Sequence, residues 1–449
     1  MSPVIDIIDR IGDVDGESMM RLVENAYPIC RSITGDGLRK TLALVGTHVD
    51  IDIHEIPSGT AVFDWTVPDE WNIRDAYVAD TDGRRLIDFR RSNLHVVNYS
   101  APVNERMTFD ALAPHLHTLP DHPDWVPYRT SYYARSWGFC LAHSQLQAMQ
   151  KAGDDKPYDV VIDASLEPGH LSYGEVFLPG RSTDEILLTT HVCHPSMCND
   201  NLSGVTVLTQ LARLLRDTDR HHSIRCLFMP GTIGAISWLA LNRGKLRNIR
   251  HALVLAGLGD TGPLTYKRSR DGMATVDRAV ENVLAHTPAL GDKSPRVVDF
   301  SPYGYDERQF NSPGIALPAG RLSRSEYGSY AEYHTSADNL DFIQPTALLD
   351  SLRALVRIIG ALDGNGCWRN TQPFCEPQLG KRGLYDAADA GADWEQVRLA
   401  LLWVLNLGDG EHDLLSIAAR SGLPFDAVSR AASRLAKAGL LERTSTQTA

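Results

Sequence analysis

The sequence lacks several features that would each assign it to a particular class of protein. No stretch approaches the roughly 18 consecutive apolar residues of a membrane span, so we expect no membrane partner. Basic residues are not in excess: 44 Lys and Arg stand against 56 Asp and Glu, and the formal net charge is −12. The net negative charge therefore argues against nucleic acid as a partner. The sequence also contains no repeats and no low-complexity tract.

Neither the cysteines nor the first residues indicate secretion. Seven cysteines are scattered over 449 residues, and an odd number without a framework is typical of reduced thiols. Residues 1–10 lack both the basic and the apolar regions of a secretory signal. We therefore expect a cytoplasmic protein.

The order of apolar patterns predicts several units along the chain. Helical spacing in residues 15–27 and 36–47 is followed by short alternating segments that indicate a β-rich unit. Apolar strands then alternate with helical patterns, which indicates an α/β domain with a largely parallel sheet. The expected strands are 185–192, 224–229 and 251–258, and the expected helices are 203–216, 234–242 and 346–363.

The C-terminal part predicts a different structure. Residues 366–383 are rich in Pro, Gly, Cys and Gln and have the composition of a linker. Three helical patterns then follow one another in the arrangement of a winged helix, at residues 394–405, 413–421 and 424–435.

Two loops contain side chains suited to a metal site. The first follows an expected strand and holds His191, His194 and Asp200 within ten residues. The second holds His334 among turn-forming polar residues. Because zinc prefers imidazole nitrogens and carboxylate oxygens, the two loops together predict a zinc site.

Several motifs together resemble a known family, the bacterial aminopeptidase-like proteins of uncertain function. The resemblance extends over nearly the whole chain. It is carried by Ser32-Ile33-Thr34-Gly35-Asp36-Gly37, residues 64–73, Thr130-Ser131-Tyr132-Tyr133, Trp137-Gly138-Phe139-Cys140, Cys193-His194-Pro195-Ser196 and Glu332-Tyr333-His334-Thr335-Ser336.

This resemblance implies an α/β fold of the zinc-aminopeptidase type, with a mostly parallel sheet flanked by helices. It also implies an inserted β-rich domain, a C-terminal winged helix, and a role in polysaccharide or natural-product biosynthesis. The expected domains are 1–55 with 156–375 for the catalytic domain, 56–155 for the insert, and 380–449 for the winged helix.

The resemblance also implies the metal ligands. His191, Asp200 and His334 match ligand positions of related zinc aminopeptidases, whereas His194 has no counterpart there. His194 therefore stays open as a fourth ligand, a partner of a ligand or a substrate contact.

The chain departs from those aminopeptidases where they carry two adjacent glutamates, one of them the general base. Here the matching stretch is residues 230–234, with Gly231 and Thr232 in place of carboxylates. A further expected carboxylate falls near Ala256 and Gly257, with Asp260 the nearest substitute. We therefore expect one Zn²⁺ per chain rather than two.

Other residues are candidates for catalysis and substrate binding. Glu307 and Glu332 could accept a proton, and an extended segment would place Glu332 on the same face as His334. Arginine suits bidentate contact with a carboxylate, although charged runs are more often solvated surface. The candidates for substrate contact are Arg268, Arg270, Arg308, Arg324 and Tyr333, with Arg321 in the same stretch as Arg324.

Together these features predict a zinc-dependent, aminopeptidase-like hydrolase that acts on an amide bond of a small amino-acid-bearing substrate or short peptide. Two alternatives stay open: a ligand-binding or regulatory protein on a degenerate fold, and an enzyme that forms amide bonds. From Gly380 onward, eight Lys and Arg face nine Asp and Glu, so we expect the winged helix to serve packing or homo-oligomerisation rather than DNA binding.

Overall fold

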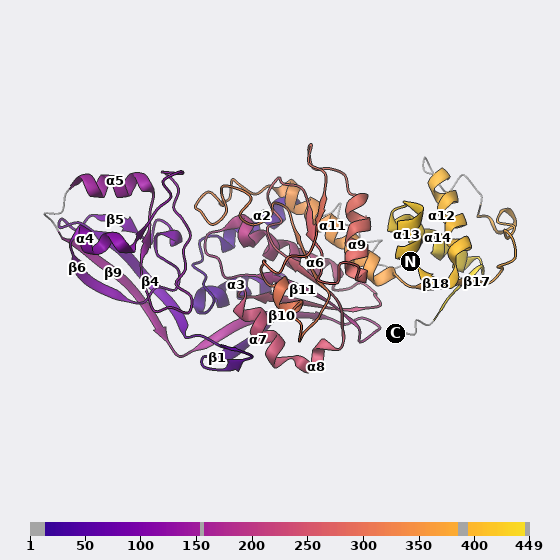
Figure 1. The fold of residues 1–449 in the computed structure, drawn as a ribbon, viewed down its shortest axis with the longest axis horizontal. Coiled ribbons are helices and arrows are strands. Elements are labelled where there is room, and N and C mark those ends of the chain that lie inside the picture. Colours follow the sequence, from indigo (N-terminus) through magenta and orange to yellow (C-terminus); the bar gives the residue numbers. More distant parts are fainter. Residues whose placement is uncertain (1–13, 153–156, 385–393, 445–449) are drawn as a thin grey trace.

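The computed structural model describes residues 14–152, 157–384 and 394–444, which form three units arranged in a row (Figure 1). The β-rich unit lies at one end, the unit with the large sheet lies in the middle, and the C-terminal helical unit lies at the other end. Residues 1–10, on which the prediction about secretion rests, are outside the described residues. None of the described helices is both long and apolar enough to span a bilayer.

The middle unit is built on an eight-stranded sheet. In order across the sheet, its strands are β1 (Asp52–Pro57), β10 (His170–Leu178), β12 (Ser223–Met229), β11 (Glu185–His191), β13 (Ile249–Leu255), β16 (Ala319–Ser323), β14 (Thr265–Lys267) and β15 (Arg296–Val298). The four strands from β12 to β16 are parallel, whereas antiparallel pairs join β10 to β12 and β14 to β16. The sheet is therefore mixed, and its parallel part, as expected, lies at the centre.

Two hydrophobic cores cover the two faces of this sheet. Ile186 and Leu188 pack in one core with five helices of the middle unit, whereas Leu187 between them packs in a second core with α7 and the inserted unit. A strand that is buried on both faces needs apolar residues at successive positions, which explains the apolar run of β11. The helices of this unit are α2 (Gly16–Ala26), α3 (Asp36–Gly46), α6 (Gly204–Leu215), α7 (Ile233–Leu241), α8 (Arg243–Leu246), α9 (Thr275–Ala285), α10 (Glu307–Phe310) and α11 (Pro345–Gly364).

The inserted unit contains an antiparallel sheet in the order β5 (Arg85–Asp88), β4 (Glu70–Ala79), β9 (Tyr158–Glu167) and β6 (Val103–Met107). Because β9 belongs to this sheet, the insert extends past residue 155, where its boundary was expected. Its remaining elements are β2 (Ala61–Val62), β3 (Trp65–Thr66), β7 (Leu116–His117), β8 (Phe139–Cys140), α4 (Phe109–Leu112) and α5 (His143–Ala152).

The C-terminal unit has the three winged-helix helices that were expected, and a three-stranded sheet that was not. Its helices are α12 (Trp394–Leu407), α13 (Leu414–Ser421) and α14 (Phe425–Lys437). Its sheet has the order β18 (Asp409–Asp413), β17 (Cys367–Asn370) and β19 (Leu441–Arg443). Strand β17 lies in the stretch that was predicted to be a linker, so the sheet of this unit starts before residue 380.

Candidate metal centre

His191 is placed by the sheet itself. It is the last residue of β11, between two parallel neighbours, and its side chain is buried. The carboxyl ends of parallel strands are the usual place for binding residues, because loops from neighbouring strands meet there. His191 Nε2 lies 2.7 Å from Asp200 Oδ1, so the strand end and the following loop form one cluster.

The loop that carries Asp200 is held by a second buried carboxylate. Asp338 accepts backbone N–H bonds from Cys198, Asn199 and Asp200 at 3.1, 2.6 and 2.9 Å. Burial raises the pKa of Asp338 to about 7, and these hydrogen bonds and the nearby charge of Asp200 also act on it. Asp338 thus orients the loop so that the Asp200 carboxylate faces the histidines.

His194 completes the cluster on the opposite side of Asp200. The buried guanidinium of Arg31 donates to the His194 carbonyl from Nε and Nη2, at 3.1 and 2.9 Å. Cys193 Sγ lies 3.2 Å from His194 Nδ1, which leaves Nε2 facing Asp200 Oδ2 at 3.9 Å. Burial lowers the pKa of His194 well below its usual value, so the imidazole is neutral.

The loop that carries His334 is clamped to the inserted unit. Tyr128 N donates to the His334 carbonyl at 2.8 Å, and Ser336 N donates to the Val126 carbonyl at 2.8 Å. His334 Nε2 lies 3.0 Å from Asp200 Oδ2, on the carboxylate oxygen that does not contact His191. The insert therefore positions His334, although the two segments are far apart in the sequence.

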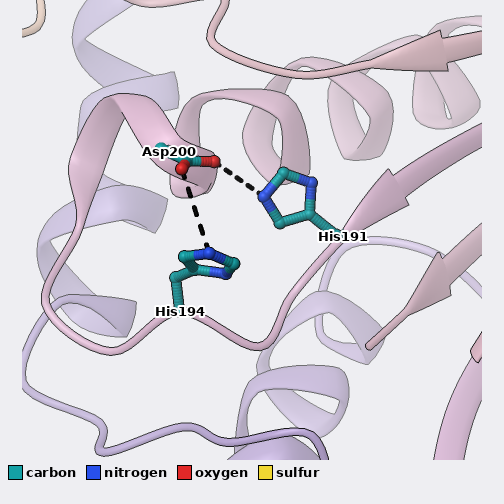
Figure 2. Close-up of side chains that lie close together, drawn as sticks. All are labelled: His191, His194 and Asp200. Carbon is teal, nitrogen blue, oxygen red and sulfur yellow. Dashed lines mark hydrogen bonds and ion pairs between the residues drawn. The ribbon is translucent and has the colours of Figure 1, made fainter. Parts of the chain in front are cut away.

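The chemistry of this cluster fits a divalent metal such as zinc. His191, His194 and Asp200 each offer one ligand atom, these atoms lie within 4.8 Å of one another, and the three side chains point toward one another (Figure 2). Burial opposes ionisation of Asp200, but attraction to the imidazoles and hydrogen bonds from His191 and His334 outweigh it and hold its pKa well below the usual value. A neutral imidazole and an ionised carboxylate are the forms that bind zinc.

Two cavities meet at this cluster. The first, called the inner cavity here, has a volume of about 250 Å³ and is lined by His191 and Asp200 together with five tyrosines, two arginines and two serines. The second, the outer cavity, has a volume of about 670 Å³ and is lined by His194, His334 and residues of the inserted unit. Tyr305 and Tyr333 line both, so the histidines and Asp200 lie where the two cavities adjoin.

The two glutamates predicted as proton acceptors lie in unsuitable places. Glu307 is fully buried, and its Oε1 is 3.1 Å from Lys267 Nζ and 3.5 Å from Arg321 Nη1. The segment around Glu332 is a turn rather than an extended strand, and His334 has a φ of 55°, so the condition under which Glu332 and His334 would share a face is not met. Glu332 is not among the residues that line either cavity.

Of the residues predicted to contact substrate, two line the inner cavity and three line neither cavity. Arg308 and Tyr333 line the inner cavity. Arg324 is fully buried and donates to Gly262 O and Ser351 Oγ, so its role is structural. Arg268 pairs with Glu281, and Arg270 is exposed; neither lines the two cavities.

Tyr305 is a site residue that sequence reasoning missed. Its ring lies over Gly231, where an added Cβ would be 2.2 Å from Tyr305 Cε1, and its centroid is 4.2 Å from that of His191. The ring thus fills the space that a side chain at Gly231 would need. Asp260 does not supply the missing carboxylate either, because its oxygens accept hydrogen bonds from Asn199 and Ser325.

Comparisons with solved structures agree with this architecture. A crystal structure of a Clostridium acetobutylicum protein described as a peptidase superposes with a TM-score of 0.91, at 46% identity, covering 98% of this chain and 100% of the other. The zinc aminopeptidase BSAP from Bacillus subtilis has a TM-score of 0.55 at 13% identity, over 77% of this chain and 93% of the other, which shows a shared fold. The aminopeptidase-like α/β fold is therefore confirmed.

Sequence comparisons identify the family. A Clostridium acetobutylicum protein, named as a polysaccharide biosynthesis protein with an aminopeptidase-like domain, is 47% identical over 442 residues, which are 98% of this chain and 100% of that protein. Residues 366–443 match the winged helix-turn-helix model, which includes β17. Residues 20–365 match the model of a domain of unknown function, DUF4910, so the chain belongs to the DUF4910 family and joins an aminopeptidase-like domain to a C-terminal winged helix.

Proposed function

We propose that this protein is a metal-dependent hydrolase that cleaves an amide bond in a small amino-acid-bearing substrate, with one zinc ion per chain. The observation that carries the proposal is the cluster of two histidines and one aspartate where two cavities meet. His191, His194, Asp200 and His334 are the candidate ligands, of which a catalytic zinc ion would use three and leave its fourth position to water. The name of the Clostridium relative supports a role in polysaccharide biosynthesis.

The two cavities suit the two halves of such a substrate. A bound zinc ion polarises a carbonyl and lowers the pKa of water toward 7. The amide bond would lie at the cluster, with one half of the substrate in the inner cavity and the other half in the larger outer cavity. The insert forms part of the outer wall, so it would help to select the half that lies there.

Tyr305 would act as a hydrogen-bond donor in this reaction. Burial raises the pKa of Tyr305 well above its usual value, so the phenol keeps its proton at neutral pH. The residue lines both cavities beside His191. A fixed O–H donor near a developing oxyanion is a common source of transition-state stabilisation.

No dedicated carboxylate base belongs to this proposal. Among the described residues that line the two cavities, Asp200 is the one carboxylate, and it is assigned to the metal. The same observation favours a second candidate function, in which the protein binds the substrate without hydrolysing it. The two functions differ in turnover, not in the residues that bind.

The test is metal content together with hydrolysis of a panel of aminoacyl amides. We expect about one zinc per chain in the wild type, and loss of both zinc and turnover in His191→Ala and His194→Ala. His412→Ala is a matched control, because His412 also contacts an aspartate, Asp409 at 2.6 Å, but lies in the winged helix. Zinc retained in both site variants would refute the metal centre, and zinc without turnover on any substrate would favour the binding protein.

A further inference from the structure

The inner cavity contains two hydrogen-bond donors that lack partners. Arg321 and Ser323 lie two residues apart in β16, on the same face of the strand, and both line the inner cavity. Both are nearly inaccessible to solvent, at 2% and 3% exposure. Within the described part of the chain, Arg321 Nε and Ser323 Oγ have no hydrogen-bond partner. Buried polar groups are usually satisfied, so two unpartnered donor atoms on residues that line a cavity point to a ligand group bound there.

The charges around Arg321 indicate the sign of that ligand. Glu307 Oε1 is shared between Arg321 Nη1 and Lys267 Nζ, so one carboxylate faces two cationic side chains. Arg308 adds a third cationic group to the neighbourhood and lines the same cavity. Asp200 is the one acidic residue among the described lining residues, and the metal centre uses it. Arg308 is exposed and its charge is solvated, whereas Arg321 and Lys267 are buried and share one carboxylate, which favours an anionic ligand group beside them.

The walls of the inner cavity fix the position of the guanidinium. Arg321 lies over the ring of Tyr327, with its Cζ 4.5 Å from the ring centroid, and this contact restricts the orientation of the guanidinium plane. A guanidinium held in one plane suits a carboxylate, because both groups are flat and their hydrogen bonds are charge-assisted. The volume of about 250 Å³ suits a small side chain or a chain end rather than a large anion.

From these features we propose that the inner cavity binds a carboxylate group of the substrate, with Arg321 and Ser323 as its hydrogen-bond donors. The inference rests on the proposed function for its statement that the carboxylate belongs to an amide substrate. Because His191 and Asp200 line the same cavity, the carboxylate would lie close to the amide bond. The protein would then act on amides of acidic or carboxylate-terminated amino acids and discriminate against neutral ones.

The experiment measures binding separately from turnover. N-acetyl-L-alanine and N-acetyl-L-alaninamide form a matched pair of probes, since they differ in a carboxylate against a carboxamide. Titration calorimetry on the purified, metal-loaded protein should show the acid bound at least about tenfold more tightly than the amide. Arg321→Ala should remove this preference, and Ser323→Ala should reduce it several-fold.

Two further variants keep the test decisive. Arg321→Lys keeps the positive charge and should retain part of the preference, which covers the case in which Arg321→Ala fails to fold. Arg270→Ala is the control, because this arginine is exposed and lines neither cavity, and it should leave both affinities unchanged. Circular dichroism and metal content establish that each variant is folded and loaded.

Several results would overturn the inference. Equal binding of the acid and the amide by the wild type would remove the carboxylate subsite. A preference for the acid that persists in Arg321→Ala with unchanged metal content would place the carboxylate elsewhere. Failure of the proposed function would look different, because the wild type would still prefer the acid and lose that preference in Arg321→Ala while hydrolysing neither N-acetyl-L-alanine nor any of the aminoacyl amides.

Discussion

Replacing Gly231 with alanine should displace the ring of Tyr305. A Cβ at this position would lie 2.2 Å from Tyr305 Cε1 and 2.4 Å from both Cζ and the hydroxyl oxygen, distances that non-bonded carbon atoms do not tolerate. Gly231 is not among the described residues with positive φ, so the cost of the methyl group comes from this contact. Overpacking of this kind costs about 1–3 kcal/mol.

A double-mutant cycle separates this contact from other effects of the substitution. In a Tyr305→Ala background the ring is absent, so Gly231→Ala should cost less than about 1 kcal/mol, which leaves a coupling of about 1–2 kcal/mol between the two sites. The assay is urea unfolding followed by circular dichroism, with the midpoint compared across the four proteins. Equal midpoint shifts in both backgrounds would refute the claim that Tyr305 occupies the space above Gly231.

Turnover offers an independent measurement on the same residues. Tyr305→Phe keeps the ring and removes the hydroxyl, so it should leave stability nearly unchanged. If the phenol donates a hydrogen bond to the reacting carbonyl, kcat should fall by about 10²-fold while metal content is unchanged. Full activity in Tyr305→Phe would show that the hydroxyl group takes no part in the reaction and that Tyr305 acts only by packing.

Three further predictions concern carboxyl groups that are buried or half-buried. Glu307→Gln leaves Lys267 and Arg321 without their carboxylate partner, so the free energy of unfolding should fall by about 3–5 kcal/mol. The measurement is the unfolding midpoint. A variant that is as stable as the wild type but has lost turnover would instead favour a catalytic role for Glu307. Asp413 caps α13 and pairs with Arg278 of α9, so Asp413→Ala should cost about 1–3 kcal/mol and loosen the winged helix, as limited proteolysis would show. Asp306 is buried, its oxygens have no partner among the described residues, and burial raises its pKa to about 8. The pKa of Asp306 in the folded protein lies above its value in the unfolded chain, so the folded state loses stability as pH rises from about 4 to about 8. Asp306→Asn removes this loss and should therefore raise Tm more at pH 8 than at pH 5.

Each of these three predictions has a control variant or a result that would contradict it. Arg270→Ala serves as the surface control for unfolding measurements, since its side chain is exposed. Unchanged proteolysis in Asp413→Ala would show that other contacts hold the winged helix. Parallel curves of Tm against pH for the wild type and Asp306→Asn would mean that the Asp306 carboxyl is not held neutral by its surroundings.

Local patterns in the sequence determined much of the fold and part of the candidate site. Apolar periodicity predicted the central strands and the three winged-helix helices, because a buried strand or an amphipathic helix records its environment in adjacent residues. His191 and Asp200 could be paired because they share one loop, and His334 was suggested by its place among turn-forming polar residues and by the resemblance. The boundaries at β9 and β17 were missed, because a strand that pairs with remote partners carries no local mark of the sheet to which it belongs.

Only the tertiary structure decided what surrounds those residues. Tyr305 lies over Gly231, the insert clamps the His334 loop, and Glu307 is neutralised by cations, and each of these contacts joins segments that are distant in the chain. A sequence shows which side chains are available, whereas burial and partnership depend on which segments the fold brings together. The residue types that can bind a metal were therefore readable from the sequence, but which carboxylates are free and where a substrate can lie were not.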